Sequence, residues 1–145
     1  MESSEALATI LADSSFRLKG DDEDPRRYVQ EELGVCYQTG KDRCYRDVAT
    51  LFSAQFSLND ILTVFSESET IPEVFSRCHQ VTHYLARTEY LRTKDLPGIF
   101  NTCNFTCHGG CYHGAIEEYL EERKLLSGQD DRIVRQEIAS MCGRK

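Results

Sequence analysis

The twelve residues from 103 to 114 constrain this chain more than any other stretch, because they concentrate reactive and conformationally unusual residues. They read Cys-Asn-Phe-Thr-Cys-His-Gly-Gly-Cys-Tyr-His-Gly and hold three of the seven cysteines, two of the four histidines and three of the nine glycines. The other two histidines lie in a second short window, Cys78-His79-x-x-x-His83. All the histidine therefore lies in two windows, which can meet around a metal, a haem, a reactive thiol or only disulfide bonds.

The size and composition of the chain limit the classes of protein to which it can belong. Its 145 residues suffice for one domain, and 40% hydrophobic with 28% charged residues is typical of a soluble globular protein. No apolar run approaches the roughly 20 residues that span a bilayer, and the N-terminus lacks the pattern of a secretory signal. A net charge of −7 without clustered lysine and arginine argues against nucleic acid as a partner.

The seven cysteines favour an oxidising, extracytoplasmic compartment over the cytosol, although a metal site or catalytic thiols would also explain such an excess. Cys36 and Cys44 flank a turn, and they can bridge each other or reach separate partners. Cys103 and Cys111 are separated by the same number of residues. Six cysteines allow about 15 pairings, and the sequence does not choose among them. The odd count leaves at least one thiol unpaired within a single chain.

The hydrophobic spacing predicts an all-α fold, since no segment alternates apolar and polar residues as a half-buried strand does. Asp24-Pro25 is a strong helix start, Gly40 a helix stop, and Ser57 an N-cap. Residues 94–100 contain Leu-Pro-Gly and are expected to form a turn. Helices are expected at about 3–12, 25–38, 42–55, 57–65, 72–92, 111–126 and from 130 onward.

These elements predict an irregular bundle of five to seven helices, stapled by disulfides. We expect residues 1–24 to form an N-terminal arm and an acidic linker, and residues 25–145 to form a helical metal-binding domain.

The histidine spacing predicts a metal site. His79 and His83 are four residues apart on a predicted helix, so that both rings project from one face, and His113 and Glu117 have the same spacing on a later helix. If the two helices pack antiparallel, three imidazoles and one carboxylate can bind a divalent transition metal, with zinc or iron favoured. Candidate hydrogen-bond partners for the imidazoles are Glu89 and Tyr90.

Other chemistries also fit the cysteine-rich stretch. Cys103-x-x-x-Cys107-His108 is a longer-spaced variant of the motif that attaches haem c, with His108 as the axial ligand. Cys107 or Cys111 can serve as a catalytic thiol near a helix N-terminus. Gly109-Gly110 before a helix is suited to binding a small anion. In the metal interpretation His108 has no role, and the cysteines form the framework.

The two windows together resemble those of a group of uncharacterised prokaryotic helical proteins that carry Cys-His-x-x-x-His followed by Gly-Cys-x-His-Gly-x-x-Glu. The resemblance covers roughly residues 36–120 and carries no activity. It implies that the windows belong to one site, with the cysteines bridged in an extracytoplasmic setting. The matching residues are Cys78, His79, His83, Gly110, Cys111, His113, Gly114 and Glu117.

The expected function is therefore metal binding, in a metal-dependent hydrolase or oxidase of a small substrate if the protein is an enzyme. Glu117 would be either a metal ligand or the catalytic general base. The first alternative is a non-catalytic helical interaction module with structural disulfides, in which the histidines line an interface. The second is a haem-binding redox protein.

Overall fold

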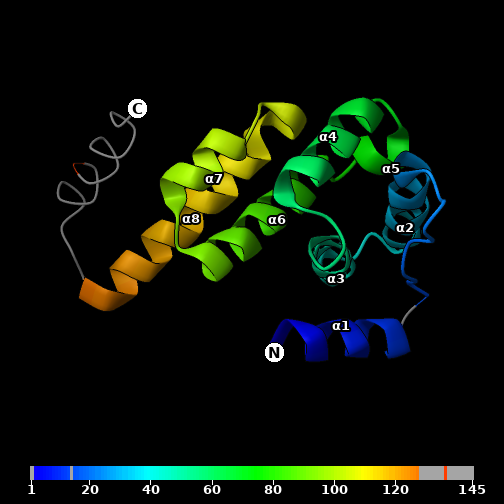
Figure 1. Ribbon diagram of the computed structural model, residues 1–145, viewed down its shortest axis with the longest axis horizontal. Helices are drawn as coiled ribbons and strands as arrows, with labels where there is room; N and C mark the ends of the chain where they lie inside the picture. The colour runs from blue at the N-terminus through cyan, green and yellow to red at the C-terminus, as the bar shows by residue number, and fades with distance from the viewer. Residues whose placement is uncertain (1, 14, 128–135, 137–145) are drawn as a thin grey trace.

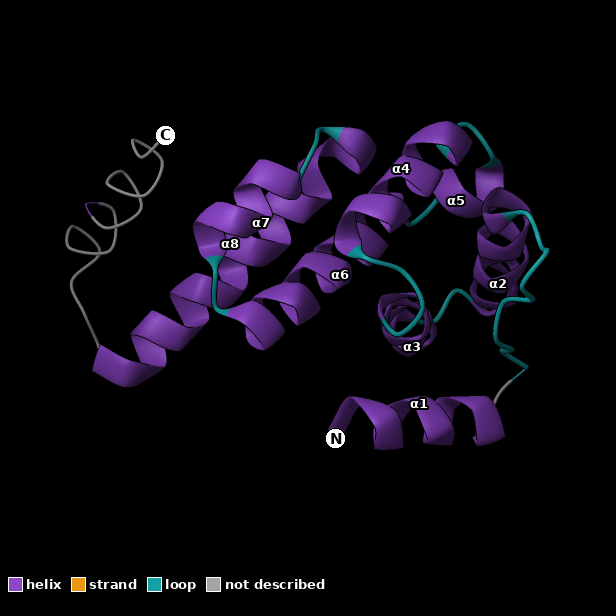
Figure 2. Cartoon of the chain, viewed as in Figure 1, coloured by secondary structure: helices purple, strands orange, loops and turns teal. Residues whose placement is uncertain are grey.

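The structure is a computed structural model, and it describes residues 2–13, 15–127 and 136. In this part of the chain it is all-helical, with eight helices and no strand, against the expected five to seven (Figures 1 and 2). None of these helices is long and apolar enough to cross a membrane. The helices are α1 (Glu2–Asp13), α2 (Pro25–Thr39), α3 (Asp42–Ser53), α4 (Leu58–Ser68), α5 (Pro72–Phe75), α6 (Cys78–Thr93), α7 (Leu96–Thr102) and α8 (Thr106–Ser127).

The helix ends that carry a local signal are confirmed. The side chain of Asp24 accepts a hydrogen bond from the amide of Arg26 at the start of α2, with Pro25 in the first turn. Gly40 ends that helix with a left-handed backbone (φ 66°). The hydroxyl of Ser57 caps α4 by accepting a hydrogen bond from the amide of Asp60.

Two expectations about secondary structure are wrong. The predicted turn at 94–100 is largely helix α7, because Asp95 caps it by accepting a hydrogen bond from the amide of Gly98. The predicted helix over 72–92 is divided into α5 and α6 at Arg77. The side chain of Arg77 bonds Asp42 and lies over the ring of Tyr45, which are tertiary contacts that the local sequence does not announce. The helix predicted from 130 onward lies outside the described residues.

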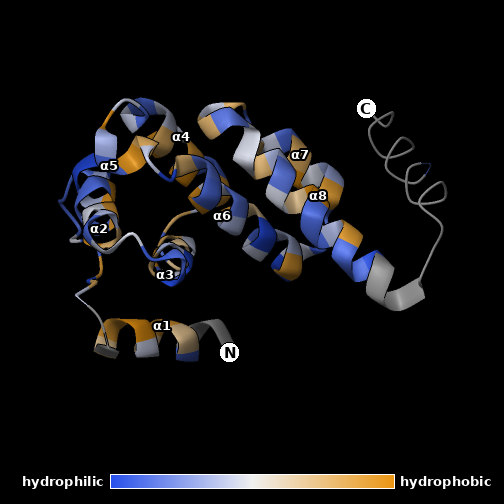
Figure 3. Cartoon of the chain, turned by 180° about the vertical axis from the view of Figure 1, so that it is seen from behind, coloured by the Kyte–Doolittle hydropathy of each residue, from blue (hydrophilic) through white to orange (hydrophobic). Residues whose placement is uncertain are grey.

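Helix α6 is the centre of the fold. It packs against α3 and α4 on one side and along α8 on the other, while α1 lies beneath α3 (Figure 1). Polar residues interrupt both α6 and α8 in the hydropathy view of Figure 3, so that neither is a continuously apolar helix. The largest fully buried side chains belong to α6 and the helices around it, namely Tyr28, Leu33, Tyr45, Leu51, Phe52, Ile61, Leu62, Phe65 and Leu85.

Helices α6 and α8 are parallel, so the antiparallel packing on which the predicted metal site was conditional is not the packing observed. Helix α7 causes the difference, because it carries the chain back toward the start of α6 before α8 begins (Figure 2). Along the contact, the residue numbers of α6 and α8 rise together, and the paired residues are always 34 positions apart in the sequence. The three pairs with this separation are His79 with His113, His83 with Glu117, and Arg87 with Glu121.

Two glycines of α8 allow the two helices to approach closely. A Cβ atom on Gly110 would overlap the hydroxyl of Thr82 and lie 2.5 Å from the carbonyl oxygen of His79. One turn further on, a Cβ atom on Gly114 would overlap the carbonyl oxygen of His83 and lie 2.9 Å from its Cα atom. Only a residue without a side chain lets these backbones touch, so the glycines set the distance between the helices.

The segment between α1 and α2 is anchored rather than free. The buried carboxyl of Glu32 accepts a hydrogen bond from the amide of Arg17 at 2.7 Å, and the hydroxyl of Tyr28 donates to the carbonyl of Arg17. Phe16 is buried beside them, and Ile10 of α1 belongs to the core. Two residues of the segment predicted to be an arm and linker, Ile10 and Phe16, therefore contribute to the core.

Replacement of a contact glycine tests the close approach. Gly114→Ala is expected to lower the free energy of unfolding by roughly 1–3 kcal/mol, because the added methyl group must push α8 away from α6. The matched control is Gly34→Ala in α2, where nothing lies within 4 Å of the position that the added methyl group would take. This control is expected to gain about 0.5–1 kcal/mol from helix propensity. Urea unfolding measures both, and equal stability of Gly114→Ala and wild type would contradict the packing.

Neighbouring carboxyls on α2 predict opposite pH dependences. Burial raises the pKa of Glu32 above its ordinary value of 4.5, whereas hydrogen bonds from Arg17 and Arg27 lower the pKa of Glu31. The ionised form of Glu32 is therefore unfavourable in the folded protein, and the ionised form of Glu31 is favourable.

Glu32→Gln, which keeps the acceptor oxygen, is expected to be more stable than wild type at pH 7. The difference should shrink below pH 4.5, where the carboxyl is protonated in both folded and unfolded states. Glu31→Gln should be less stable than wild type at pH 7, and that difference should shrink as the pH falls below 4.5 toward the lowered folded-state pKa of Glu31. Thermal unfolding at pH 7 and pH 4 measures both, and the same sign for the two variants at pH 7 would contradict the account.

Candidate functional site

Residues 103–109, called the loop below, comprise the three residues before α8 and the kinked first turn of that helix, and two disulfide bonds hold them. Cys103 pairs with Cys111 across the loop, and Cys107 pairs with Cys78 at the start of α6. The third disulfide, Cys36–Cys44, closes the turn between α2 and α3 with the same separation of eight residues as the Cys103–Cys111 bond. The expectation of a disulfide-stapled fold is confirmed. The seventh cysteine lies outside the described residues.

The loop contains a turn with a left-handed backbone. Cys107 (φ 58°), His108 (φ 58°) and Gly109 (φ 76°) lie in this region in succession, and right-handed helix follows from Gly110. For residues other than glycine this conformation costs roughly 1–2 kcal/mol each. Cys107 is held in it by its disulfide to Cys78 and by the carboxylate of Glu69, which accepts a hydrogen bond from its amide at 3.2 Å.

The turn fixes the orientation of the first histidine. Nδ1 of His79 lies 3.0 Å from the carbonyl oxygen of Cys107. A carbonyl oxygen can only accept, so Nδ1 carries the proton and Nε2 presents a lone pair when the ring is neutral. Nε2 of His79 lies 3.4 Å from Nδ1 of His113. Two bare lone pairs would repel each other at this distance. Either Nδ1 of a neutral His113 therefore donates its proton in a hydrogen bond to Nε2 of His79, or a bound cation lies between the two nitrogens.

The next turn of both helices carries a second pair. Nε2 of His83 lies 3.1 Å from one carboxylate oxygen of Glu117, and a guanidinium nitrogen of Arg87 lies 3.6 Å from the other oxygen. Arg87 also bonds Glu118 and Glu121. The carboxylate of Glu117 is thus held between an imidazole and a guanidinium group.

The four residues expected to form the site line one open groove of about 580 Å³ between α6 and α8. Ile116 and Leu120 supply its apolar part. The ring centroid of His79 lies 5.1 Å from that of His113 and 6.2 Å from that of His83. Among the described residues, no group of three or more His, Cys, Asp or Glu side chains has the arrangement of a bound-metal site. The sequence therefore identified residues that share a groove, and they are arranged in it as two pairs.

Sequence reasoning missed the groups that orient these side chains. The expected partners of the imidazoles were Glu89 and Tyr90, but Glu89 pairs with Arg92 and the hydroxyl of Tyr90 faces Glu122. That expectation is wrong because the orienting groups come from outside α6. They are the carbonyl of Cys107 for His79 and the carboxylate of Glu117 for His83. A backbone carbonyl leaves no trace in residue type, whereas Glu117 was already identified.

The disulfides also bear on the other chemistries considered for this loop. Cys103 and Cys107 belong to two different disulfides, so in this state neither has the thiol that a thioether bond to haem needs. The same holds for Cys107 and Cys111 as catalytic nucleophiles. His108 is exposed and does not line the histidine groove; it lines a separate pocket beside the Cys78–Cys107 disulfide.

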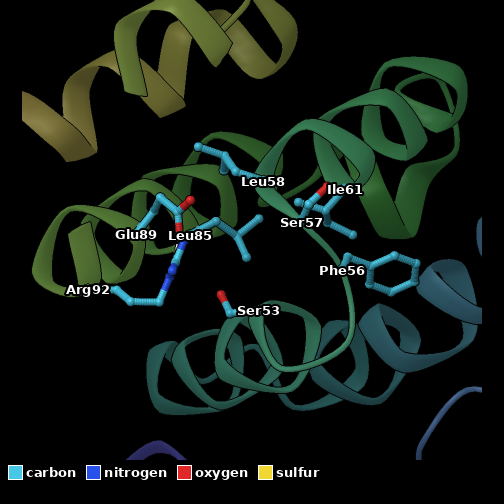
Figure 4. Close-up of a pocket in the computed structure, with 8 residues that line it drawn as sticks. All are labelled: Ser53, Phe56, Ser57, Leu58, Ile61, Leu85, Glu89 and Arg92. Atoms are coloured by element: carbon cyan, nitrogen blue, oxygen red, sulfur yellow. Dashed lines mark hydrogen bonds and ion pairs between the residues drawn. The ribbon is translucent and has the colours of Figure 1, made fainter. Parts of the chain in front are cut away.

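A further pocket, of about 190 Å³, lies between α3, α4 and α6 (Figure 4). Its wall is formed by Leu58, Ile61 and Leu85, and at one side Arg92 bonds Glu89 at 2.8 Å. No histidine or cysteine is among its lining residues. The groove between α6 and α8 therefore combines more reactive side chains than this pocket does.

Comparison with known proteins gives no relative: no family model, no curated protein and no solved structure matches this chain.

Proposed function

We propose that the groove between α6 and α8 binds a divalent transition metal, zinc or iron, through His79 and His113, with His83 and Glu117 as further ligands. The observation that carries the proposal is the 3.4 Å separation between Nε2 of His79 and Nδ1 of His113. Two nitrogens bound to one zinc ion at about 2.0–2.1 Å lie about 3.3 Å apart in tetrahedral coordination. The two rings therefore have the spacing of two ligands of one ion.

The hydrogen bond to His79 supports the same proposal. Metal-binding histidines commonly donate their second ring N–H to a carbonyl or carboxylate, which fixes the tautomer and the orientation of the ring. The carbonyl of Cys107 accepts such a bond from Nδ1 of His79, and it is itself held by a disulfide. His83 and Glu117 are separated by 3.1 Å, which is also a spacing that two ligands of one ion can adopt.

A bound zinc or iron would activate water or dioxygen for reaction with a small molecule in the groove. Where Glu117 is not itself a ligand, its carboxylate can serve as the general base, held in the groove by Arg87 and His83. Its side chain is 48% exposed, so it can exchange protons with solvent. Ile116 and Leu120 offer an apolar surface to the non-reacting part of the substrate.

A second candidate function is a non-catalytic interaction module in which the histidines line an interface. The His83–Glu117–Arg87 contacts favour it, because they satisfy the charge of Glu117 without a metal. Under this alternative the protein binds no metal, and the two candidates differ in one measurement.

The three disulfides support an oxidising compartment for the protein, since disulfides persist there and are rare in the cytosol. They also support a rigid scaffold, because two of the three hold the loop that orients His79.

The metal content of the purified protein tests the proposal directly. Protein purified without chelators, then dialysed against zinc, is expected to hold one zinc ion per chain by mass spectrometry of the metal, with no Soret band in its visible spectrum. His79→Ala and His113→Ala should each lower zinc affinity by at least about tenfold, because each removes a ligand. Isothermal titration calorimetry measures the affinities.

The matched control is His108→Asn, which removes the remaining histidine and tolerates the left-handed backbone at that position. Its zinc affinity should equal that of wild type. A protein that binds no metal would favour the interaction module, and a Soret band would favour a haem protein. Loss of zinc in only one of the two alanine variants would contradict a site that joins the two helices.

A further inference from the structure

Both cysteines of the Cys78–Cys107 disulfide line a second pocket, which shares His79 with the groove. This pocket has a volume of about 370 Å³, and both cysteines, His79 and His108 line it. Its rim includes Phe75, which is 61% exposed. The two cysteines are almost fully buried, so we expect a small thiol to approach their sulfur atoms only through this pocket.

His79 lines both the pocket and the groove. It also follows Cys78 directly in the chain, and its Nδ1 donates to the carbonyl of Cys107. Both cysteines of the disulfide are thus connected to the His79 ring. Cys78 is its neighbour in the chain, and the carbonyl of Cys107 accepts its hydrogen bond.

The disulfide is one of the constraints that keep this carbonyl in place. Cys107 and His108 have left-handed backbones, which residues with a side chain adopt only when their surroundings hold them there. The disulfide and the bond from the Cys107 amide to Glu69 provide that hold. Without the disulfide, Cys107 can relax to a common backbone conformation, and its carbonyl then leaves Nδ1 of His79.

We infer that Cys78–Cys107 is a redox-active disulfide that exchanges with a dithiol through this pocket, and that its reduction weakens metal binding in the neighbouring groove. The second part rests on the proposed function. The thiolate of the dithiol attacks one cysteine sulfur, the sulfur–sulfur bond breaks, and the other cysteine leaves as a thiolate and takes a proton. The second thiol of the reagent then resolves the mixed disulfide. Two electrons and two protons pass from the dithiol to the two cysteines.

The exchange is tested by graded reduction. Wild-type protein is treated with rising concentrations of dithiothreitol, alkylated with iodoacetamide and mapped by peptide mass spectrometry. Alkylation of Cys78 and Cys107 is expected at lower reagent concentrations than alkylation of Cys103 and Cys111. Reduction of the Cys103–Cys111 bond first would overturn the assignment of the reactive disulfide.

The effect on the site is tested with a double variant that creates no new thiols. Cys78→Ser with Cys107→Ser is expected to bind zinc at least about tenfold more weakly than wild type, the loss typical when an orienting partner of a ligand is removed. The control is Cys36→Ser with Cys44→Ser, which removes the disulfide between α2 and α3 and should bind zinc as wild type does. Circular dichroism and thermal unfolding establish that both variants are folded.

Two outcomes separate this inference from the proposed function. If wild type binds no zinc, the proposed function fails; if wild type and the Cys78/Cys107 variant bind zinc equally, only the inference fails. If the double variant folds poorly, a measurement on wild-type protein without metal tests the link instead. The ¹⁵N shifts of His79 in wild type should indicate a proton on Nδ1, and mild reduction should remove that signature. An unchanged His79 tautomer after reduction of Cys78–Cys107 would overturn the link.

Discussion

The contact between the backbones of α6 and α8 is the constraint on which the rest of the site depends. Gly110 and Gly114 face the carbonyl oxygens of His79 and His83, with no room for a side chain between the helices. Because the two glycines are one turn apart, the contact repeats along the helices and fixes their register. In that register the side chains three residues after each glycine, His113 and Glu117, meet the two histidines of α6.

This geometry gives most residues of the two windows a physical role. Two glycines supply the close approach, and two histidine-containing pairs fill the groove beside it. Cys78 and Cys111 join α6 and the start of α8 to the loop, through Cys107 and Cys103 respectively. The spacing of the motif residues in the sequence is thus the spacing of successive turns on two parallel helices.

Features that depend on neighbouring residues in the chain were predictable. The Asp24 cap, the glycine stop at Gly40 and the Ser57 cap each form a hydrogen bond or a turn within four residues, so that local sequence determines them. That His79 and His83 share one helix face, as do His113 and Glu117, was predictable for a similar reason, since both pairs are spaced by four residues. This spacing carries no information on whether α8 runs parallel or antiparallel to α6.

Features that depend on the path of the chain were not predictable. The Leu-Pro-Gly segment resembles a turn, yet it forms helix α7, whose first turn is capped by Asp95. Because α7 carries the chain back toward the start of α6, helices α6 and α8 are parallel. The disulfide partners follow from this path, as does the carbonyl of Cys107 that orients His79. A single sequence contains no local signal for contacts made by backbone atoms across 28 residues.

The central claim is that the close approach of α6 and α8 builds a metal site from both helices. Anomalous diffraction at the zinc edge, from crystals grown with zinc, tests it most directly. The account predicts one anomalous peak in the groove, about 2.0–2.1 Å from both Nε2 of His79 and Nδ1 of His113. A groove without a peak, or a peak bound only to residues of one helix or to His108, would contradict it.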